Sequence, residues 1–268
     1  MHHQLNIMKT FVPRTLRCPS VAASLVAALF LTAGCQSARQ NSTVDPAMYP
    51  PARTKERQAE ISPQDALTKL RAGNARFVAG QSQVSNLPAK VRATASGQYP
   101  FAVILSCLDS RQPIELIFDQ SIGDVFNARV AGNVLNDDIL GSLEFACKVS
   151  GSKLIVVLGH SHCGAVKGAI DGVELGHLAG LLDRIKPAIA SAPEGDQPRN
   201  STNDAFVQKV AEANVRLAMQ QIRERSPILR QMIDDGQIAL VGGMYDLSTG
   251  EVHFFTKSNN HEPRFLAR

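Results

Sequence analysis

The sequence contains no tryptophan, no dense block of Lys and Arg, and no apolar run long enough to cross a membrane as a helix. Its formal net charge of +4 over 268 residues is mild, so the charge pattern does not favour nucleic-acid binding. Internal repeats and low-complexity segments are also absent. The remaining composition, 44% hydrophobic and 19% charged, is that of an ordinary globular domain. A chain of this size buries enough surface to fold without disulfides.

Five cysteines are present, and two of them, Cys18 and Cys35, precede the part that is expected to fold. The other three are Cys107, Cys147 and Cys163. An odd number at these spacings is not the framework of a disulfide-stapled domain. Cys107 and Cys163 lie in motifs that favour a metal, whereas Cys147 lies among apolar residues of an expected helix and is predicted to pack in the core.

The first 35 residues are predicted to be a signal peptide. Basic residues precede an apolar run at 21–32, which has the length of a signal-peptide core. The run leads into Ala33-Gly34-Cys35, which resembles the end of a bacterial lipobox, although Thr32 stands where that pattern prefers Leu. We therefore expect a lipid on Cys35 and a periplasmic protein anchored to a membrane, with Gln36 indicating the outer membrane. Ordinary cleavage nearby and an uncleaved anchor are the alternatives.

Residues 36–60 are predicted to be a flexible tether, and residues 61–268 to form one folded domain. The stretch Asn41–Glu60 is polar, contains three prolines and shows no apolar period. Ser62-Pro63-Gln64-Asp65 then has the composition of a helix start, with a capping serine, a proline at the first helical position and an acid in the first turn. Apolar residues recur at helical spacing from there up to Gly80.

Short, continuous apolar runs alternate with helical patterns in the rest of the chain. Such runs suit strands buried on both faces of a sheet, and the alternation predicts an α/β fold with a mostly parallel sheet flanked by helices. A turn at Asp246–Gly250 predicts a hairpin that adds an antiparallel edge strand near the C-terminus. The expected strands are Phe101–Leu105, Val125–Val130, Leu154–Leu158 and Ile238–Val241; the expected helices are Ile139–Val149, Leu178–Ile189 and Val207–Ile222; and 81–98 is expected to be a loop. Pro187 is expected to kink or shorten the second of these helices.

Two short motifs directly follow the first and third expected strands. They are Cys107-Leu108-Asp109-Ser110-Arg111 and Gly159-His160-Ser161-His162-Cys163. Both sit at the carboxyl ends of parallel strands, where open α/β sheets build their sites. Two thiolates and an imidazole suit zinc, and three protein ligands leave a fourth position for water, as in catalytic zinc sites. Asp109 and Arg111 are expected to form an ion pair beside that position.

Each of these residues also has a purely structural interpretation. A buried free cysteine is common, a lone histidine can be a satisfied core residue, and a surface ion pair contributes little. The spacing of His160 and Cys163 is weak evidence for a metal by itself. The two motifs together, each at a strand end, make the metal site the favoured hypothesis.

The sequence resembles the β-carbonic anhydrases of bacteria and plants. Its Cys107, Asp109 and Arg111 match the family's C-x-D-x-R motif, and His160 and Cys163 match its H-x-x-C motif. The likeness runs from about Ile61 to Phe255 and includes Leu70–Phe77, Arg129–Asn133, Ala213–Val215 and Ser226–Leu229. The resemblance implies the family's fold, one zinc ion per chain, and the reversible hydration of carbon dioxide to bicarbonate and a proton.

The resemblance also implies roles for individual residues. The two cysteines and the histidine of these motifs would bind zinc, Asp109 would orient the attacking hydroxide, and Arg111 would hold Asp109 ionised. Asp109 could also swing onto the zinc as a fourth ligand in an inactive, closed site. Gln98 would hydrogen-bond the substrate across a dimer interface, so a homodimer or a larger homo-oligomer is expected. Certain bacterial members have a bicarbonate-inhibition site that uses a tryptophan, so this chain is not expected to share that regulation.

Two other functions stay open at this point. Relatives on this fold hydrolyse carbon disulfide or carbonyl sulfide with the same zinc ligands, and tunnel shape and assembly are the features that separate them. A periplasmic lipoprotein that only holds zinc is the non-enzymatic alternative. The Asp109–Arg111 pair speaks against storage, because a storage site has no use for an acid that orients hydroxide.

Overall fold

The computed structural model describes residues 52–83, 85–192 and 198–255. The predicted signal peptide, its Cys35 and the predicted tether up to residue 51 lie outside the described residues. The described residues contain a five-stranded sheet with the order β2-β1-β3-β4-β5. Its strands are β1 (Ala102–Ser106), β2 (Val125–Arg129), β3 (Leu154–His160), β4 (Ala239–Tyr245) and β5 (Val252–Phe254).

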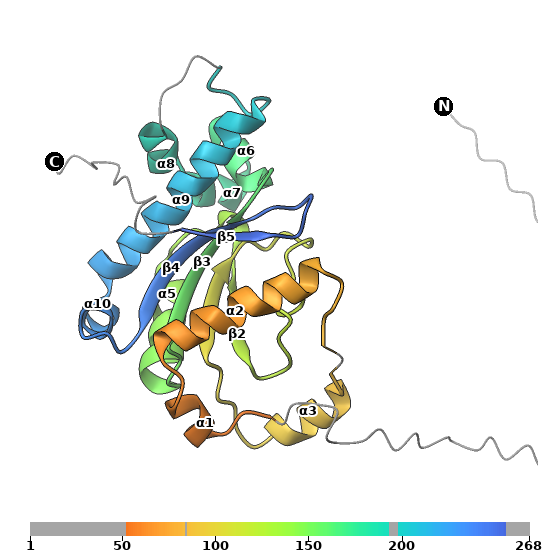
Figure 1. Cartoon of the computed structure of the whole chain (residues 1–268). Helices are drawn as coiled ribbons and strands as arrows, with labels where there is room; N and C mark the ends of the chain where they lie inside the picture. The colour runs from red at the N-terminus through yellow and green to blue at the C-terminus, as the bar shows by residue number, and fades with distance from the viewer. Residues whose placement is uncertain (1–51, 84, 193–197, 256–268) are drawn as a thin grey trace, which may run out of the picture. The chain divides into compact units, whose positions relative to one another are not determined.

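The first four strands run parallel, and β5 pairs antiparallel with β4 at one edge (Figure 1). The turn between β4 and β5 is held by Asp246, whose carboxylate accepts hydrogen bonds from the N–H of Ser248 at 2.7 Å and of Thr249 at 3.3 Å. Both the parallel α/β sheet and the antiparallel hairpin predicted from the sequence are confirmed.

Helices cover the sheet and fill the connections between its strands. The α-helices are α1 (Lys55–Ala59), α2 (Pro63–Val78), α3 (Leu87–Thr94), α4 (Ile114–Ile117), α5 (Asp137–Glu144), α6 (Gly164–Ile170), α7 (Gly176–Leu182), α8 (Lys186–Ser191), α9 (Asp204–Arg225) and α10 (Pro227–Asp234). A 3₁₀ turn, η2 (Ala131–Asn133), follows β2, and a π-helical turn, η3 (Phe145–Val149), continues α5. None of the helices within the described ranges is both long and apolar enough to span a membrane.

The sheet has a hydrophobic core on each face, because successive strand residues point to opposite sides. Val103 and Ile155 face the core that α9 covers, whereas Ile104 and Val156 face the core that contains Leu70 of α2. All seven residues of β3 are buried. The continuous apolar runs in the sequence therefore mark strands that are covered on both sides.

Helix α9 lies close to β3 and β4 because glycines in both strands leave room for it. A Cβ on Gly159 would lie 2.8 Å from Val215 Cγ2, and one on Gly242 would lie 2.9 Å from Val215 Cγ1. Val215 of α9 thus packs directly against the strand backbone. Since Gly159 precedes His160, this contact fixes the end of β3 that carries the histidine.

Helix α2 begins as the sequence predicts. The Ser62 hydroxyl accepts a hydrogen bond from the N–H of Asp65 at 3.1 Å, and the Asp65 carboxylate accepts one from the N–H of Ser62 at 3.2 Å. The two bonds form a capping box, with Pro63 at the first helical position.

The chain becomes ordered earlier than the sequence predicts. Helix α1 lies inside the segment expected to be tether, and its Gln58 is only 5% exposed. The Gln58 amide donates hydrogen bonds to the carbonyls of Pro100, at 2.7 Å, and Ser150, at 2.8 Å. The expectation of a flexible segment as far as Glu60 is therefore wrong for the described residues 52–60, because this buried amide holds them against the domain.

Two further predictions concern helices. The segment 81–98, expected to be a loop, contains α3, which Asn86 begins by accepting a hydrogen bond from the N–H of Ala89 at 3.1 Å. The expected helix at 178–189 is split into α7 and α8, and Pro187 lies in the first turn of α8. The interruption at Pro187 is confirmed. The expectation of a loop at 81–98 is wrong for α3, whose polar and weakly periodic sequence does not show the pattern of a helix.

Candidate metal centre

Two neighbouring parallel strands bring the two sequence motifs together. Ser106 of β1 is paired with Leu158 of β3, so the residues that follow them emerge at the same edge of the sheet. Cys107 directly follows β1, His160 ends β3, and Cys163 is the residue that precedes α6. The expected convergence of residues far apart in the sequence is therefore observed.

Cys107, His160 and Cys163 form a buried cluster. The two sulfurs and a ring nitrogen of the histidine all lie within 4.8 Å of one another. The three residues are 5%, 0% and 2% exposed, respectively. A compact set of two sulfurs and one imidazole nitrogen is the donor set that zinc prefers.

The hydrogen bonds of His160 leave one ring nitrogen directed at this cluster. Nδ1 lies 2.9 Å from the carbonyl oxygen of Ser161, so Nδ1 carries the proton and donates it. The other ring nitrogen, Nε2, is buried with no hydrogen-bond partner. Ser161 is itself held in place, since its N–H donates to the carbonyl of Tyr245 at 3.0 Å and its hydroxyl accepts from the N–H of Leu247 at 3.0 Å. An orphaned, oriented nitrogen of this kind is what a metal ligand requires.

The pKa values of the two thiols are shifted in opposite directions. A hydrogen bond from Cys163, together with one from the N–H of Gly132, lowers the pKa of Cys107 to about 4, despite its burial. The same contact with Cys107, together with burial, raises the pKa of Cys163. Two thiolates this close repel each other unless a cation lies between them. The donor set therefore fits a divalent metal ion, which stabilises both sulfurs in the deprotonated form.

Asp109 and Arg111 form the ion pair that the sequence predicts. Arg111 Nε donates to Asp109 Oδ1 at 2.9 Å and its NH2 group donates to Oδ2 at 2.7 Å, while the N–H of Arg111 donates to Oδ1 at 2.9 Å. These hydrogen bonds hold the pKa of the Asp109 carboxyl well below its usual range. Asp109 Oδ2 lies 3.9 Å from Nε2 of His160, so an ionised carboxylate stands at the border of the cluster.

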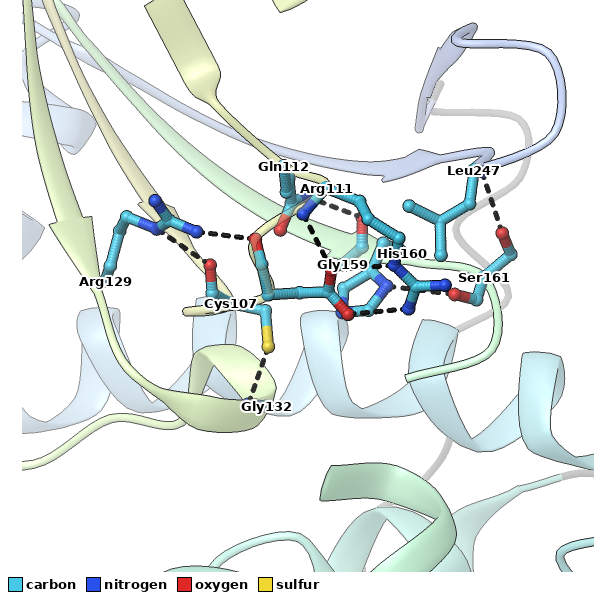
Figure 2. A network of polar contacts seen from close by, with 10 residues as sticks. Cys107, Arg111, Gln112, Arg129, Gly132, Gly159, His160, Ser161 and Leu247 are labelled. Atoms are coloured by element: carbon cyan, nitrogen blue, oxygen red, sulfur yellow. Dashed lines mark hydrogen bonds and ion pairs between the residues drawn. The ribbon is translucent and has the colours of Figure 1, made fainter. Parts of the chain in front are cut away.

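The side chain of Arg129, at the end of β2, holds the first motif in place. Its Nε donates to the carbonyl of Cys107 at 3.1 Å (Figure 2). Its NH2 group donates to the carbonyl of Asp109 at 2.6 Å. Sequence reasoning gave Arg129 no role. Its position at a strand end beside the first motif is the signal that could have suggested one.

Gly132 supports Cys107 from the other side. Its N–H donates to Cys107 Sγ at 3.3 Å, and its carbonyl accepts from the side chain of Asn214 in α9 at 2.7 Å. Gly132 has φ of 66°, and a Cβ there would lie 2.7 Å from Ile185 Cδ1. Only glycine fits both this conformation and this space. Asn214 is a supporting residue that the sequence gave no reason to select.

The remaining candidates lie outside the cluster. Gln98 is exposed in the single chain, and its expected contact across a dimer stays a prediction. Asp109 is bound to Arg111 and is not part of the group of atoms within 4.8 Å, so its alternative role as a fourth ligand also stays a prediction. His162 lies 3.2 Å from Asp204 and is exposed. Cys147 is 2% exposed, and burial raises the pKa of its thiol to about 12, which agrees with the predicted core position.

Comparison with known proteins identifies the family of the chain. A family model described as carbonic anhydrase matches residues 102–252, which is more than half of the sequence. Carbonic anhydrase 2 of Mycobacterium tuberculosis is 39% identical over 195 residues, covering 70% of this chain and 91% of the relative. This chain belongs to the carbonic anhydrase family. A carbonic anhydrase of Mycolicibacterium smegmatis is 36% identical over 197 residues, covering 71% and 92% of the two chains.

Solved structures place this carbonic anhydrase in the β class. A β-carbonic anhydrase of Aspergillus fumigatus matches with a TM-score of 0.56 and 26% identity, covering 71% of this chain and 91% of the other. A tetrameric β-carbonic anhydrase of Sordaria macrospora matches with a TM-score of 0.55 and 25% identity, covering 72% and 95%. The buried Cys107–His160–Cys163 cluster is consistent with a carbonic anhydrase zinc site.

Proposed function

We propose that this protein catalyses the reversible hydration of carbon dioxide to bicarbonate and a proton, with one zinc ion per chain held by Cys107, His160 and Cys163. The observation that carries the proposal is the buried Nε2 of His160, which has no hydrogen-bond partner and lies within 4.8 Å of two cysteine sulfurs. Membership of the carbonic anhydrase family supports it. When bound, zinc supplies a Lewis acid that makes water a strong nucleophile at neutral pH.

Asp109 and Arg111 supply orientation beside that ion. The carboxylate of Asp109 stays ionised at neutral pH because Arg111 donates to both of its oxygens. An ionised carboxylate accepts hydrogen bonds only, so it fixes which way the proton of the nucleophile points. Arg111 is 58% exposed at its side chain, and its role is to position Asp109. Arg129 and Gly132 keep the backbone and sulfur of the first motif in place for this geometry.

Gln98 and the assembly belong to the same proposal. Gln98 would hydrogen-bond the substrate of a neighbouring copy, which requires a homodimer or a larger oligomer. Its exposure in the single chain leaves the side chain available for such a contact. The relative from Sordaria macrospora, described as tetrameric, gives the proposal a precedent.

The N-terminal sequence leads us to propose a periplasmic location with a lipid on Cys35. The support is the signal-peptide-like run at 21–32 followed by Ala33-Gly34-Cys35. A lipid at that position would leave a short connection before α1, which begins at Lys55.

The proposed activity is tested by stopped-flow hydration of carbon dioxide with the full-length, detergent-solubilised protein. Zinc-loaded protein is expected to be active, and removal of the metal with a chelator is expected to abolish hydration until zinc is restored. Carbon disulfide and carbonyl sulfide are assayed in parallel. Turnover of the sulfur compounds but not of carbon dioxide would show that they are the substrates. A fully zinc-loaded protein without any turnover would favour zinc storage.

A further inference from the structure

A polar cavity lies at the opposite end of the strands from the cysteines and the histidine. It has a volume of about 480 Å³ and is lined by α1, α2, α3 and the loop that precedes β2. The N–H of Phe101, just before β1, donates to the carbonyl of Asp124 in this lining, and the Arg53 guanidinium lies 4.8 Å from the Phe101 ring centroid. Cys107 follows the other end of β1. Because β1 has five residues, the two sites are separated by about 17 Å of strand.

The cavity carries an excess of positive charge. Arg53, Arg57, Lys69 and Arg76 line it, together with the buried Lys90, which has a partner of its own, and the only acids in the lining are Asp119 and Asp124. The basic residues come from three different segments of the chain, so the excess is not the solvated face of a single helix.

Both acids are already engaged. Asp119 accepts from Arg76 Nε at 2.5 Å and from the N–H of Gln83 at 2.9 Å. Asp124 accepts from the N–H of Ser121 at 3.0 Å and, at 3.4 Å, from Arg53. These two carboxylates therefore neutralise only part of the positive charge that lines the cavity.

No ion pair is recorded for Arg57 or Lys69 within the described part of the chain. Both side chains are exposed, and both line the cavity. Lys69 is near Asp65, whose carboxyl pKa is lowered by hydrogen bonds from Ser62 and also by the charge of Lys69. Both cations remain exposed, so a ligand that enters from solvent can reach them.

Two residues that line this cavity each have a buried side-chain atom without a hydrogen-bond partner. Within the described residues, five buried side-chain atoms have none; one is Nε2 of His160 in the metal centre, and two are Ser121 Oγ and Arg53 Nε. Ser121 is 6% exposed and lines the cavity, as does Arg53. A hydroxyl and a guanidinium N–H that are removed from water need an acceptor. Neither atom is exposed to the cavity as it stands, so an anion there would accept from both after the two side chains turn toward it.

We propose that this cavity binds a phosphate group, either as inorganic phosphate or as the monoester of a small molecule. Guanidinium and ammonium groups hold phosphate oxygens with charge-assisted hydrogen bonds, and a serine hydroxyl adds a neutral donor. A neutral or cationic ligand would leave the excess positive charge uncompensated. The volume lies in the range of small-molecule pockets, so an organic group attached to the phosphate also fits.

The proposal is tested by isothermal titration calorimetry on the zinc-loaded, full-length protein in detergent at 0.15 M salt. Inorganic phosphate and glycerol 3-phosphate are titrated separately, and each is expected to bind at one site per chain. Tighter binding of the ester identifies a phosphorylated small molecule as the ligand class, and equal binding identifies the phosphate ion.

Variants locate the site. Arg57→Gln/Lys69→Gln is expected to weaken binding about tenfold or more, because two charged contacts are lost. The matched control is Lys55→Gln/Arg92→Gln, which removes the same charge from α1 and α3 at positions that do not line the cavity, and it is expected to bind as the native protein does. Ser121→Ala is expected to weaken binding about threefold without changing the net charge. Thermal melting of each variant checks that it is folded.

Three results would overturn the proposal. The first is the absence of binding to the native protein by either phosphate. The second is equal weakening in both double variants, which would mean that only the overall charge matters. The third is native affinity in Arg57→Gln/Lys69→Gln together with phosphate inhibition of carbon dioxide hydration, which would place the anion at the metal centre.

Discussion

At the scale of single residues, the surroundings of Asp109 are the most specific in the metal centre. Arg111 gives it three hydrogen bonds, and Arg129 binds its backbone carbonyl. A carboxylate held this way cannot rotate freely, and it keeps its charge at neutral pH. The side chain is therefore suited to orienting a nucleophile at the edge of the Cys107–His160–Cys163 cluster.

Asp109→Asn should keep zinc but lower the turnover of carbon dioxide by about a hundredfold or more, because an amide can donate as well as accept and no longer fixes the nucleophile. Metal analysis and stopped-flow hydration measure the two quantities on the same sample. Asp171→Asn, an exposed acid that follows α6, is the matched control and should behave as the native protein does. Unchanged turnover of Asp109→Asn would show that another group orients the nucleophile.

Cys147 should make the protein less stable in alkali. Burial raises its thiol pKa to about 12, against about 8.5 in an unfolded chain. The unfolded state therefore loses this proton first, and the stability is lost progressively as the pH rises above about 8.5, with a limiting slope of about 1.4 kcal/mol per pH unit.

Cys147→Ala should flatten this part of the profile, whatever its effect on stability at neutral pH. Urea unfolding of the zinc-loaded proteins between pH 7 and 10 measures the difference in slope. The other cysteines are the same in both proteins, so they cancel in the comparison. Parallel profiles for the two proteins would contradict the assignment of a neutral, buried thiol.

At the scale of elements, the strands were more predictable than the pieces of polar chain that dock on the sheet. Leu154–Leu158 and Phe101–Leu105 are continuous apolar runs because helices cover both faces, and this pattern is visible in the sequence. Helices α1 and α3 carry little apolar periodicity. The buried residue of α1 is Gln58, and the acceptors of its amide are 42 and 92 residues away. A local sequence pattern cannot reveal hydrogen-bond acceptors that lie so far away in the chain.

Gln58→Ala should release α1 from the domain and lower the free energy of unfolding by about 1–3 kcal/mol, because two hydrogen bonds are lost and a half-buried carbonyl is left without this donor. The Pro100 carbonyl keeps a second donor, Ser152, so the Ser150 carbonyl is the one affected most. Lys55→Ala, exposed on the same helix, is the control and should be nearly neutral. Equal stability of the two variants would show that α1 is held by something other than Gln58.

The same contrast applies to the metal centre. Its ligands could be found from the sequence because two motifs follow two strands that turn out to be neighbours. The groups that support them could not, because they act across long separations: Asn214 reaches Gly132 over 82 residues, and Arg129 reaches Cys107 over 22. A single hydrogen-bond donor does not belong to a motif with a regular spacing, so the sequence does not reveal it. The sequence therefore predicts the donor set of this site better than the framework that orients it.

At the scale of the whole molecule, the proposed lipid on Cys35 decides where the enzyme acts. Cys35→Ser should release the protein from membranes into the soluble fraction, because one thiol is the attachment point of the acyl chains. Fractionation of cells that express each form, followed by immunoblotting, measures the distribution. Cys18→Ser is the matched control and should stay with the membranes. A membrane-bound Cys35→Ser protein would contradict the lipid anchor.

The account as a whole depends on a single divalent ion between Cys107, His160 and Cys163, and a crystal of the zinc-loaded protein tests this most directly. Anomalous difference maps above and below the zinc edge should show one peak per chain, about 2.3 Å from both sulfurs and about 2.0 Å from Nε2 of His160. A map without a peak between these three atoms, or with zinc bound elsewhere in the chain, would contradict the proposed centre and the chemistry assigned to it.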